Sequence, residues 1–483
     1  MKRASESQKE PKSLKKDEEA NPTQVTEAVE QEMGEFEDPY GDEFESEDEV
    51  FEAGEDGLAD DNEEVEQKQP TARVFLPQRN LPLGENEVME PDYSTYNMLH
   101  SINVKWPCLT FDILPDSLGQ DRSSYPQTMF VVTGTQASRP KDNELTVMKF
   151  SQLGKTLLKD EEEDSDDDDE DGYDADPVLE NRSLPVNSTT NRVRVSPFAS
   201  QANEYLTASM MEDGQVHLWD LAPQFNSFGA PANISKAQQK PIFTIKAHGA
   251  VEGYGLDWNP FNKGGSLVTG DISGKIFLTE RTTGGWVTEK ESFANPTGSI
   301  EELQWSPSEK TVFASAGSDG HIRIWDIRQK RNKAALSVKA SSTDVNVMSW
   351  NRKAAHLLAS GHDDGQWAVW DLRTFTSGES VASFNFHKKA ITSVEFHPTD
   401  ESVIAVASED NTVSLWDLSV EADDEEIAQQ AKDANGELDD VPSQLLFLHW
   451  QPNVKEVHWH KQIPGTLIST GSEGFCLWNT ISV

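Results

Sequence analysis

"FASAGSDGHIRIWDIR" (Phe313–Arg328) recurs with variations as "LLASGHDDGQWAVWDLR" (Leu357–Arg373) and "VIAVASEDNTVSLWDL" (Val403–Leu418). Each copy has a small apolar run, then a polar turn with Asp–Gly or Asp–Asn, then an alternating run that ends in Trp–Asp. This pattern predicts two short strands joined by a tight turn. The closing tryptophans lie about 45 residues apart, at Trp325, Trp370 and Trp416.

A period of this length is typical of WD40 propeller blades. Weaker copies occur at 128–150, 191–221, 247–280 and 454–479. One copy cannot bury both faces of its sheet, whereas a closed ring of copies can. The sequence therefore predicts an all-β, seven-bladed WD40 β-propeller over residues 105–482.

Two further elements are expected before the first copy. Residues 91–104 are predicted to hold a short helix over Asp92–Asn103, because their apolar residues fall near one helical face and Asp92 is a suitable cap. Trp106–Leu114 is predicted to be a strand that closes the ring as the outer strand of blade seven. This closure would place Cys108 and Cys476 on neighbouring or next-neighbouring strands, as free thiols.

The charge of the chain is concentrated in three stretches. Residues 17–66 hold 23 acids and no base, residues 160–176 hold 13 acids and no base, and residues 421–440 hold 9 acids and one lysine. Their net charges of −23, −13 and −8 equal the −44 of the whole chain, so the remainder is neutral. Like-charge runs do not collapse into a core, which predicts a disordered acidic tail over 1–72, an acidic insertion over 158–182 and an acidic loop over 421–442.

These stretches attract basic proteins and repel nucleic acids and anionic membranes, unless they serve only to keep the protein soluble. We accordingly expect no direct contact with nucleic acid or membrane, and a monomer. Two cysteines do not suggest a disulfide framework, which favours a cytosolic or nuclear compartment. The basic residues of 1–16 fit either a nuclear-import signal or an ordinary terminus.

The turn aspartates are interpreted as structural, capping the turn between strands. Blade six offers a full set for a buried polar network, in His387, Ser408, Asp410 and Trp416. The sequence has no phosphate-cradling glycine loop, no GxSxG, no HExxH and no histidines at metal-ligand spacing. We therefore expect neither an enzyme nor a cofactor.

Propellers bind partners through the loops at the ends of their strands. On the face with the turn aspartates, the entry to each blade and the position before each turn aspartate supply mostly acids. These ring-face candidates are Glu212, Glu252, Tyr254, Glu301, Glu302, Asp344, Asp363 and Glu409. A basic peptide across this ring would make many charge contacts, although a generic solvated rim is the alternative.

"YNMLHSINVKWPCLTFDILPD" (Tyr96–Asp116) and "DDVPSQLLFLHW" (Asp439–Trp450) resemble segments of the histone-binding WD40 proteins related to retinoblastoma-binding and chromatin-assembly subunits. The resemblance implies a side groove that binds a histone helix. It would be lined by Tyr93, Tyr96, Leu99, His100, Asp439, Asp440, Leu445 and Phe447. Because this chain ends at Val483, the C-terminal helix of those relatives is not expected here.

The long acidic N-terminus and the acidic insertion resemble one branch more closely, the glutamate-rich WD-repeat proteins that regulate ribosome assembly. That resemblance implies a nucleolar and nuclear escort, with a cytoplasmic pool, that delivers newly made ribosomal protein L-three to pre-60S particles. Two alternatives are a histone H3–H4 chaperone and a substrate receptor of a cullin-RING ubiquitin ligase. The latter rests on "WDIR" (Trp325–Arg328) and "WDLR" (Trp370–Arg373), which match a short Trp-Asp-x-Arg motif.

Overall fold

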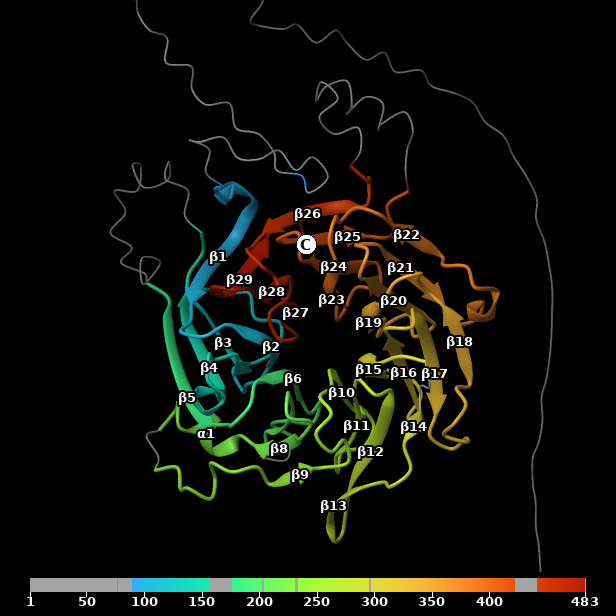
Figure 1. The fold of residues 1–483 in the computed structure, drawn as a ribbon. Coiled ribbons are helices and arrows are strands. Elements are labelled where there is room, and N and C mark those ends of the chain that lie inside the picture. Colours follow the sequence, from blue (N-terminus) through green and yellow to red (C-terminus); the bar gives the residue numbers. More distant parts are fainter. Residues whose placement is uncertain are drawn as a thin grey trace, which may run out of the picture. The chain divides into compact units, whose positions relative to one another are not determined.

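The computed structural model describes residue 76 and residues 89–156, 176–201, 204–230, 233–294, 297–421 and 441–482. These residues form seven antiparallel sheets around a central axis (Figure 1). The prediction of a seven-bladed all-β propeller is confirmed. The described helices are short: α1 (Ala222–Asn226) and the 3-10 turns η1 (Tyr93–Thr95), η2 (Pro140–Asp142) and η4 (Phe375–Ser377). In the described ranges, no helix has the length and apolarity needed to cross a membrane.

The first four blades follow one another along the chain. Blade one is β2 (Cys108–Ile113), β3 (Gln127–Thr135), β4 (Glu144–Leu153) and β5 (Val178–Pro185). Blade two is β6 (Thr190–Val195), β7 (Leu206–Met211), β8 (Val216–Asp220) and β9 (Phe243–Ile245). Blade three is β10 (Gly255–Trp258), β11 (Ser266–Gly270), β12 (Lys275–Thr282) and β13 (Gly285–Thr288), with β14 (Phe293–Ala294) also paired to β12. Blade four is β15 (Ile300–Trp305), β16 (Val312–Gly317), β17 (His321–Asp326) and β18 (Leu336–Lys339).

The last three blades complete the ring. Blade five is β19 (Val345–Trp350), β20 (Leu357–His362), β21 (Trp367–Asp371) and β22 (Ala382–Phe384). Blade six is β23 (Ile391–Phe396), β24 (Val403–Ser408), β25 (Thr412–Asp417) and β26 (Leu445–Trp450). Blade seven is β27 (Glu456–Trp459), β28 (Thr466–Thr470), β29 (Gly474–Thr480) and, from the other end of the chain, β1 (Tyr96–Asn103).

In blades two to six, an aspartate holds the tight turn between the second and third strands. In blade four, Asp319 Oδ1 accepts the backbone N–H of His321 at 3.2 Å, two residues further on. The residue after the aspartate has positive φ, which favours glycine or asparagine, as at Gly320 (72°) and Asn411 (74°). In blades two, four, five and seven the closing tryptophan is buried and donates its indole N–H to a serine on the second strand, as Trp325 does to Ser315 at 2.9 Å.

The ring is closed by β1, not by Trp106–Leu114. The β1 strand pairs antiparallel with β29, with Leu99 opposite Trp478 and Ser101 opposite Cys476. The predicted helix over Asp92–Asn103 is therefore wrong: only the turn η1 precedes the strand, and Asp92 caps that turn through Ser94. The apolar residues of Tyr96–Asn103 fit both the period of a strand and, approximately, that of a helix. The segment forms a strand because it pairs with the otherwise unpaired edge of β29.

Trp106–Leu114 instead contains β2, the inner strand of blade one. Cys108 thus lies in a different sheet from Cys476, so the predicted adjacency of the two cysteines is wrong. Both cysteines are buried free thiols.

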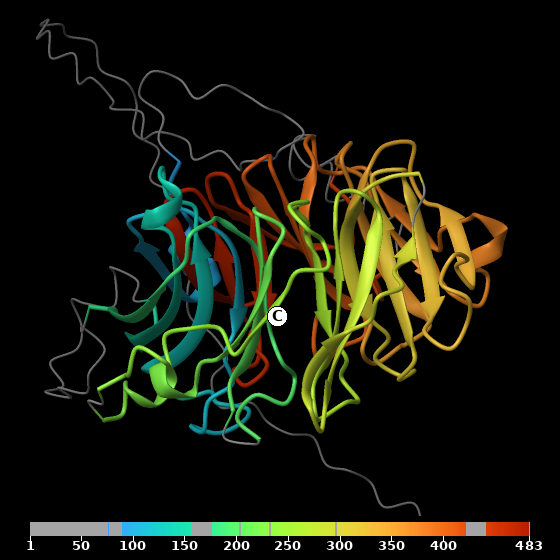
Figure 2. The ribbon, with the colours of Figure 1, turned by 60° about the horizontal axis from the view of Figure 1, so that its bottom comes forward.

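The strands run between two faces of the ring (Figure 2). We call the face where inner strands begin and the turn aspartates lie the mouth face, and the other the far face. Because neighbouring strands are antiparallel, β4 and β25 end at the far face, and β5, β26 and β1 begin there. Residues 157–175, residues 422–440 and the N-terminal stretch are therefore all joined to the propeller at the far face.

Candidate functional site

A cavity of about 250 Å³ opens at the mouth face of the central channel. Its lining combines four of the predicted ring-face residues with an arginine and several apolar or neutral groups. The lining residues are Arg192, Tyr254, Glu301, Asn346, Val347, Asp363, Ala390, Ile391, Thr392 and Glu409. The structure thus brings acids from blades four, five and six to one opening.

Carboxylates surround Tyr254 at one side of this opening. Burial raises the pKa of the Tyr254 phenol, and the charges of Glu252, Glu301 and Glu212 raise it further. The carboxylate of Glu301 accepts a hydrogen bond from Ser299, yet burial and the nearby charge of Asp344 raise its pKa. Negative charge is therefore crowded on this side, and a cation placed here would be stabilised.

Asp344 extends the same set toward blade five. Burial and the charges of Asp363 and Asp319 raise the pKa of its carboxyl group. Glu409, further round the ring, lies 3.6 Å from the ammonium group of Lys455. Of the eight predicted ring-face residues, seven therefore lie around the channel mouth with electrostatic or cavity contacts that link them.

Glu302 is the exception, and its assignment to the rim is wrong. Its side chain is turned into the channel, where Oε2 lies 3.0 Å from Arg192 Nη2 and the residue is only 7% exposed. The pairing of β15 with β16 shifts register between Ile300 and Glu302, so side chains do not simply alternate between the two faces of the sheet there. Glu302 therefore aligns with Arg192 of blade two and Glu456 of blade seven, in the wall of the channel.

Below the mouth, polar residues from all seven inner strands line the channel. At the next-to-last position of each inner strand stand Asp112, Arg194, Asp257, Gln304, Ser349, Glu395 and His458. Five of these side chains accept the backbone N–H of the last inner-strand residue in the next blade. The five donors are Val195 N to Asp112, Trp305 N to Asp257, Trp350 N to Gln304, Phe396 N to Ser349 and Trp459 N to Glu395, at 2.5–3.1 Å.

These contacts satisfy a requirement of the fold. Inner strands of neighbouring blades do not pair with each other, so their inward backbone N–H groups need other acceptors. A side chain on the preceding blade supplies the acceptor. Hydrogen bonds of this kind therefore join five of the seven pairs of neighbouring blades along the channel wall.

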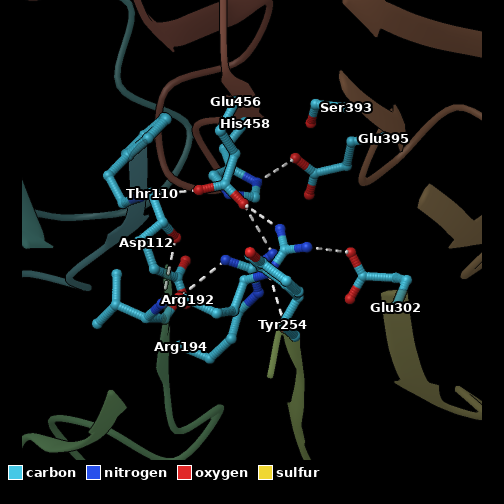
Figure 3. A network of polar contacts seen from close by, with 12 residues as sticks. Thr110, Asp112, Arg192, Arg194, Tyr254, Glu302, Ser393, Glu395, Glu456 and His458 are labelled. Carbon is cyan, nitrogen blue, oxygen red and sulfur yellow. Dashed lines mark hydrogen bonds and ion pairs between the residues drawn. The ribbon is translucent and has the colours of Figure 1, made fainter. Parts of the chain in front are cut away.

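An ionic network crosses the channel (Figure 3). The guanidinium group of Arg192 in blade two lies 3.0 Å from Glu302 of blade four and 3.0 Å from Glu456 of blade seven. Arg194 reaches the same Glu456 oxygen at 2.8 Å, and Phe111 N of blade one donates to the other oxygen at 2.8 Å. Four blades thus meet at two carboxylates and two guanidinium groups in the wall of the channel.

His458 is also part of this network. Its Nδ1 lies 2.8 Å from Glu395 Oε2 and its Nε2 lies 3.5 Å from Glu456 Oε1. Burial would lower the pKa of His458, but Glu395 and Glu456 outweigh it and raise the pKa to about 10. Burial would likewise raise the pKa of Glu456, whereas Arg194, His458 and Arg192 hold it well below its usual range. His458 is therefore an imidazolium at neutral pH.

This charge state predicts a pH dependence of stability. Unfolded histidine is protonated only below about pH 6.5, whereas folded His458 stays protonated up to about pH 10. Its stabilising effect is thus complete below pH 6.5 and declines as the pH rises toward 10. We expect the difference in free energy of unfolding between the native protein and His458→Gln to fall by up to about 1.4 kcal/mol per pH unit above pH 6.5.

Urea denaturation of both proteins between pH 5 and 9 measures this difference. Asp257, whose pKa burial raises to about 7, titrates in both proteins and so cancels in the comparison. A difference that stays constant or grows between pH 7 and 9 contradicts a protonated His458.

The structure places six of the eight predicted side-groove residues. Tyr96 and Phe447 meet edge to face at 5.2 Å, and Leu99 and Phe447 pack against the hydrophobic cluster that contains Tyr96. His100 binds the carbonyl of Gly154 on blade one, and Leu445 packs in a different cluster. Tyr93 is exposed, at 51%. Asp439 and Asp440 lie outside the described residues, so the groove itself stays a prediction.

The blade-six network has a different link from the one expected. His387 bonds Asp410 at 2.9 Å and Ser414 at 2.8 Å, and Ser414 accepts the indole N–H of Trp416 at 2.7 Å. Ser408 accepts only the backbone N–H of Asp410, at 3.2 Å, and donates to a backbone carbonyl. The network thus runs through Ser414, which lies on the same strand as the tryptophan, and Ser408 is not its link.

Sequence reasoning missed the channel network, although a signal was present. Each inner strand is short and apolar except for polar residues at alternate positions, such as Arg192 and Arg194 or Glu456 and His458. In an isolated strand this alternation indicates a solvent-exposed face. Only the ring shows that the seven polar faces converge on one axis.

Two other features were singled out in the sequence. Within the described residues, no group of three or more His, Cys, Asp or Glu side chains is placed to hold a metal ion. Arg328 and Arg373, from the two Trp-Asp-x-Arg motifs, are exposed and each pairs with the aspartate two residues before it, at 2.7 and 2.5 Å.

Two family models match parts of the chain. The model of the histone-binding protein RBBP4 and its counterpart in the CAF1 complex, named for histone H4 binding, matches residues 86–154. The model described as "Nucleolar protein 10-like, N-terminal domain", a propeller model, matches residues 263–441. Each covers less than half of the chain.

Three curated relatives match most of it. "Ribosome assembly protein rrb1" of Schizosaccharomyces pombe is 49% identical over 467 residues, which is 95% of each chain. "Protein HEAT STRESS TOLERANT DWD 1" of Arabidopsis thaliana is 40% identical over 81% of this chain and 88% of its own. "Glutamate-rich WD repeat-containing protein 1" of Dictyostelium discoideum is 40% identical over 83% of each chain. With acid-rich stretches attached to a seven-bladed ring, the chain belongs to the glutamate-rich WD-repeat family that includes the ribosome assembly protein rrb1.

Proposed function

We propose that this protein is a ribosome biogenesis factor that escorts a newly made basic ribosomal protein, L-three, to pre-60S particles. It holds a basic segment of the cargo at the channel mouth. The observation that carries the proposal is the set of crowded carboxylates around the mouth cavity, where burial and neighbouring acids raise the pKa values of Glu301 and Asp344.

The cavity suits a long basic side chain. Its volume of about 250 Å³ is bounded by apolar groups of Val347 and Ile391 and by the ring of Tyr254. These surfaces would contact the methylene stem of a lysine or arginine, while Glu301 and Asp363 would face its charged end. The carboxylates of Glu302 and Glu456 below the cavity would not bind a second cation, because they are already paired with Arg192.

The relatives support the same role. The fission-yeast relative is named a ribosome assembly protein, and the model that matches residues 263–441 describes a nucleolar protein. These names support our proposal that the protein works in the nucleus and nucleolus, and we further propose a cytoplasmic pool that meets newly made cargo. The acidic stretches would screen the positive charge of the cargo from RNA until delivery.

Reversing charges at the mouth tests the proposal. Glu252, Asp344 and Asp363 replaced together by lysine should weaken binding of L-three at least about tenfold, since each exposed charge pair contributes about 0.2–1 kcal/mol and each reversal also adds repulsion. Isothermal titration calorimetry at near-physiological salt measures the loss. Glu302 is left intact because its loss would break the buried network.

The matched control carries the same charge change at the far face. Glu309, Glu379 and Glu401 are exposed residues of far-face loops, so their replacement by lysine should change affinity less than about twofold by the same estimate for remote charges. Equal losses in the two triple variants would show that only the net charge matters and would exclude the mouth as the docking site.

A histone H3–H4 chaperone is the second candidate, favoured by the match of residues 86–154 to a histone-binding family model. A competition separates the two. Equimolar L-three and H3–H4 are mixed with the full-length protein at near-physiological salt, and the complexes are resolved by size exclusion. Recovery of L-three alone supports the escort, whereas recovery of histones, alone or in equal amount, contradicts a dedicated one.

A further inference from the structure

A second cavity, of about 270 Å³, lies at the far face between blades one and seven. It is built from the start of β1, the loop between β2 and β3, the end of β4 and the loop after β27. Its lining residues are Asn97, Arg122, Ser123, Tyr125, Gln127, Lys155, Ile463, Pro464 and Asn479. At roughly 30 Å³ per water molecule, it has room for more than ordered solvent.

Within the part of the chain that the structure describes, one lining residue, Arg122, has a donor without a partner, and so do two residues outside the lining: Thr156, which follows Lys155, and His460, which feels the charge of Arg122. Arg122 Nε and Thr156 Oγ1, which follows Lys155, are buried and have no hydrogen-bond partner among the described residues. The same holds for His460 Nε2, while the other ring nitrogen of His460 accepts the N–H of Gln462. In its neutral form His460 thus carries its proton on the unpartnered nitrogen. Buried donors left unpaired in this way indicate a missing acceptor.

The cavity also has surplus positive charge. The side chain of Arg122 is 12% exposed, and its Nη2 lies 2.8 Å from the buried carboxylate of Asp116. Lys155 lies over the ring of Tyr125 at 5.7 Å and forms no ion pair within the described part of the chain. Burial and the charges of Arg122 and Lys461 lower the pKa of His460 to about 3. Two cations therefore line the cavity, and one of them, Arg122, is paired with a carboxylate.

We propose that this far-face cavity is an oxyanion site that binds a phosphate group, with Lys155 and Arg122 supplying the charge and Ser123 a further donor. Arginine and lysine form strong charge-assisted hydrogen bonds with phosphate oxygens. The site is distinct from the acidic mouth at the other face, and it does not depend on the cargo assigned to that mouth.

A single phosphate group fits this position better than a polyanion. The acid-rich residues 160–176 follow Lys155 and Thr156 in the sequence, and their charge disfavours a long nucleic acid as the ligand. A compact phosphate, free or carried by a phosphorylated side chain, needs only the enclosed cavity. The two sources share one chemistry and are separated by the experiment.

The test is calorimetric titration of the full-length protein with sodium phosphate, with ionic strength kept constant by sodium chloride. We expect saturable binding, weakened at least about tenfold by Lys155→Glu, because a charge-assisted hydrogen bond is lost and a carboxylate takes its place. Lys155→Arg should retain binding. Lys155 is exposed, so these variants should fold as the native protein does.

Lys105→Glu is the matched control. Lys105 is also an exposed lysine over an aromatic ring, 5.6 Å from that of Trp106, but it lies at the mouth face. Its replacement should leave phosphate affinity unchanged. Absence of saturable binding to the native protein, or an equal loss in Lys105→Glu, overturns the proposal.

A second titration identifies the source of the phosphate. A phosphoserine peptide and its unphosphorylated twin are compared with inorganic phosphate. Binding of the phosphopeptide at least about tenfold tighter than phosphate, with no binding of the twin, assigns a phosphorylated protein partner. Equal affinities for peptide and inorganic phosphate assign free phosphate.

Discussion

Glu456→Gln should lower the free energy of unfolding by about 3–5 kcal/mol, the usual result of removing one partner from a buried ion pair. Glu456 faces Arg192, Arg194 and His458, and it also accepts the backbone N–H of Phe111. Glutamine preserves the shape and that last hydrogen bond but leaves the cations without their common carboxylate. Chemical denaturation at pH 7 measures the loss.

Glu309→Gln serves as the control for this substitution. It makes the same chemical change at an exposed far-face position, where substitutions alter stability by no more than about 0.5 kcal/mol. A loss below about 1 kcal/mol for Glu456→Gln would mean that the channel network does not hold the blades together.

A chain that begins at Lys105, and so lacks β1, should fail to yield a folded monomer. The strand contributes Tyr96 and Met98 to two buried clusters, and burial of each such side chain is worth about 1.5–3 kcal/mol. Its removal also opens the edge of β29, which then offers unpaired backbone groups to other chains. The combined loss of about 5 kcal/mol is comparable to the stability of a typical protein.

Size exclusion and thermal unfolding measure this outcome, with a chain that begins at Pro91 as the control. The control keeps β1 and its capped turn, so its melting temperature should match that of the full-length propeller. A folded monomer that starts at Lys105 would contradict closure by β1 and would support Trp106–Leu114 as the closing strand.

The same closure predicts a cross-link. Ser101 lies opposite Cys476, with Ser101 Oγ 3.4 Å from Cys476 Sγ. Under oxidising conditions Ser101→Cys should therefore form a disulfide with Cys476, detected by altered mobility without reductant. Ser101→Cys combined with Cys476→Ser should not, because Cys108 lies in another sheet.

The sequence predicted the blades well, because a blade is defined by local alternation and by a turn of fixed chemistry. It failed at the ring closure. Tyr96–Asn103 contains apolar residues at spacings that fit either a helix or a strand, and no local window shows that its partner is β29, nearly 380 residues away. Pairing at such a separation is set by the open edge of blade seven and not by local propensity.

The candidate site shows the same division. The mouth residues could be located because the position before each turn aspartate and the entry to each blade recur in the repeats. The position of the Glu302 side chain could not be predicted, because a local bulge determines whether this side chain faces solvent or the channel. The cavity beside Lys155 was invisible in the sequence, since its walls come from both ends of the chain.

The far-face attachment of the acidic stretches gives the molecule a sidedness. The carboxylates at the channel mouth belong to the blades and have fixed positions. The acidic stretches are attached at the opposite face, after Thr156, after Glu421 and before β1. In the proposed escort role, a cargo with two basic segments would contact both sets, whose points of attachment lie on opposite faces of the ring. Such bivalent binding raises affinity through effective concentration, and release requires only that one of the two holds is broken first.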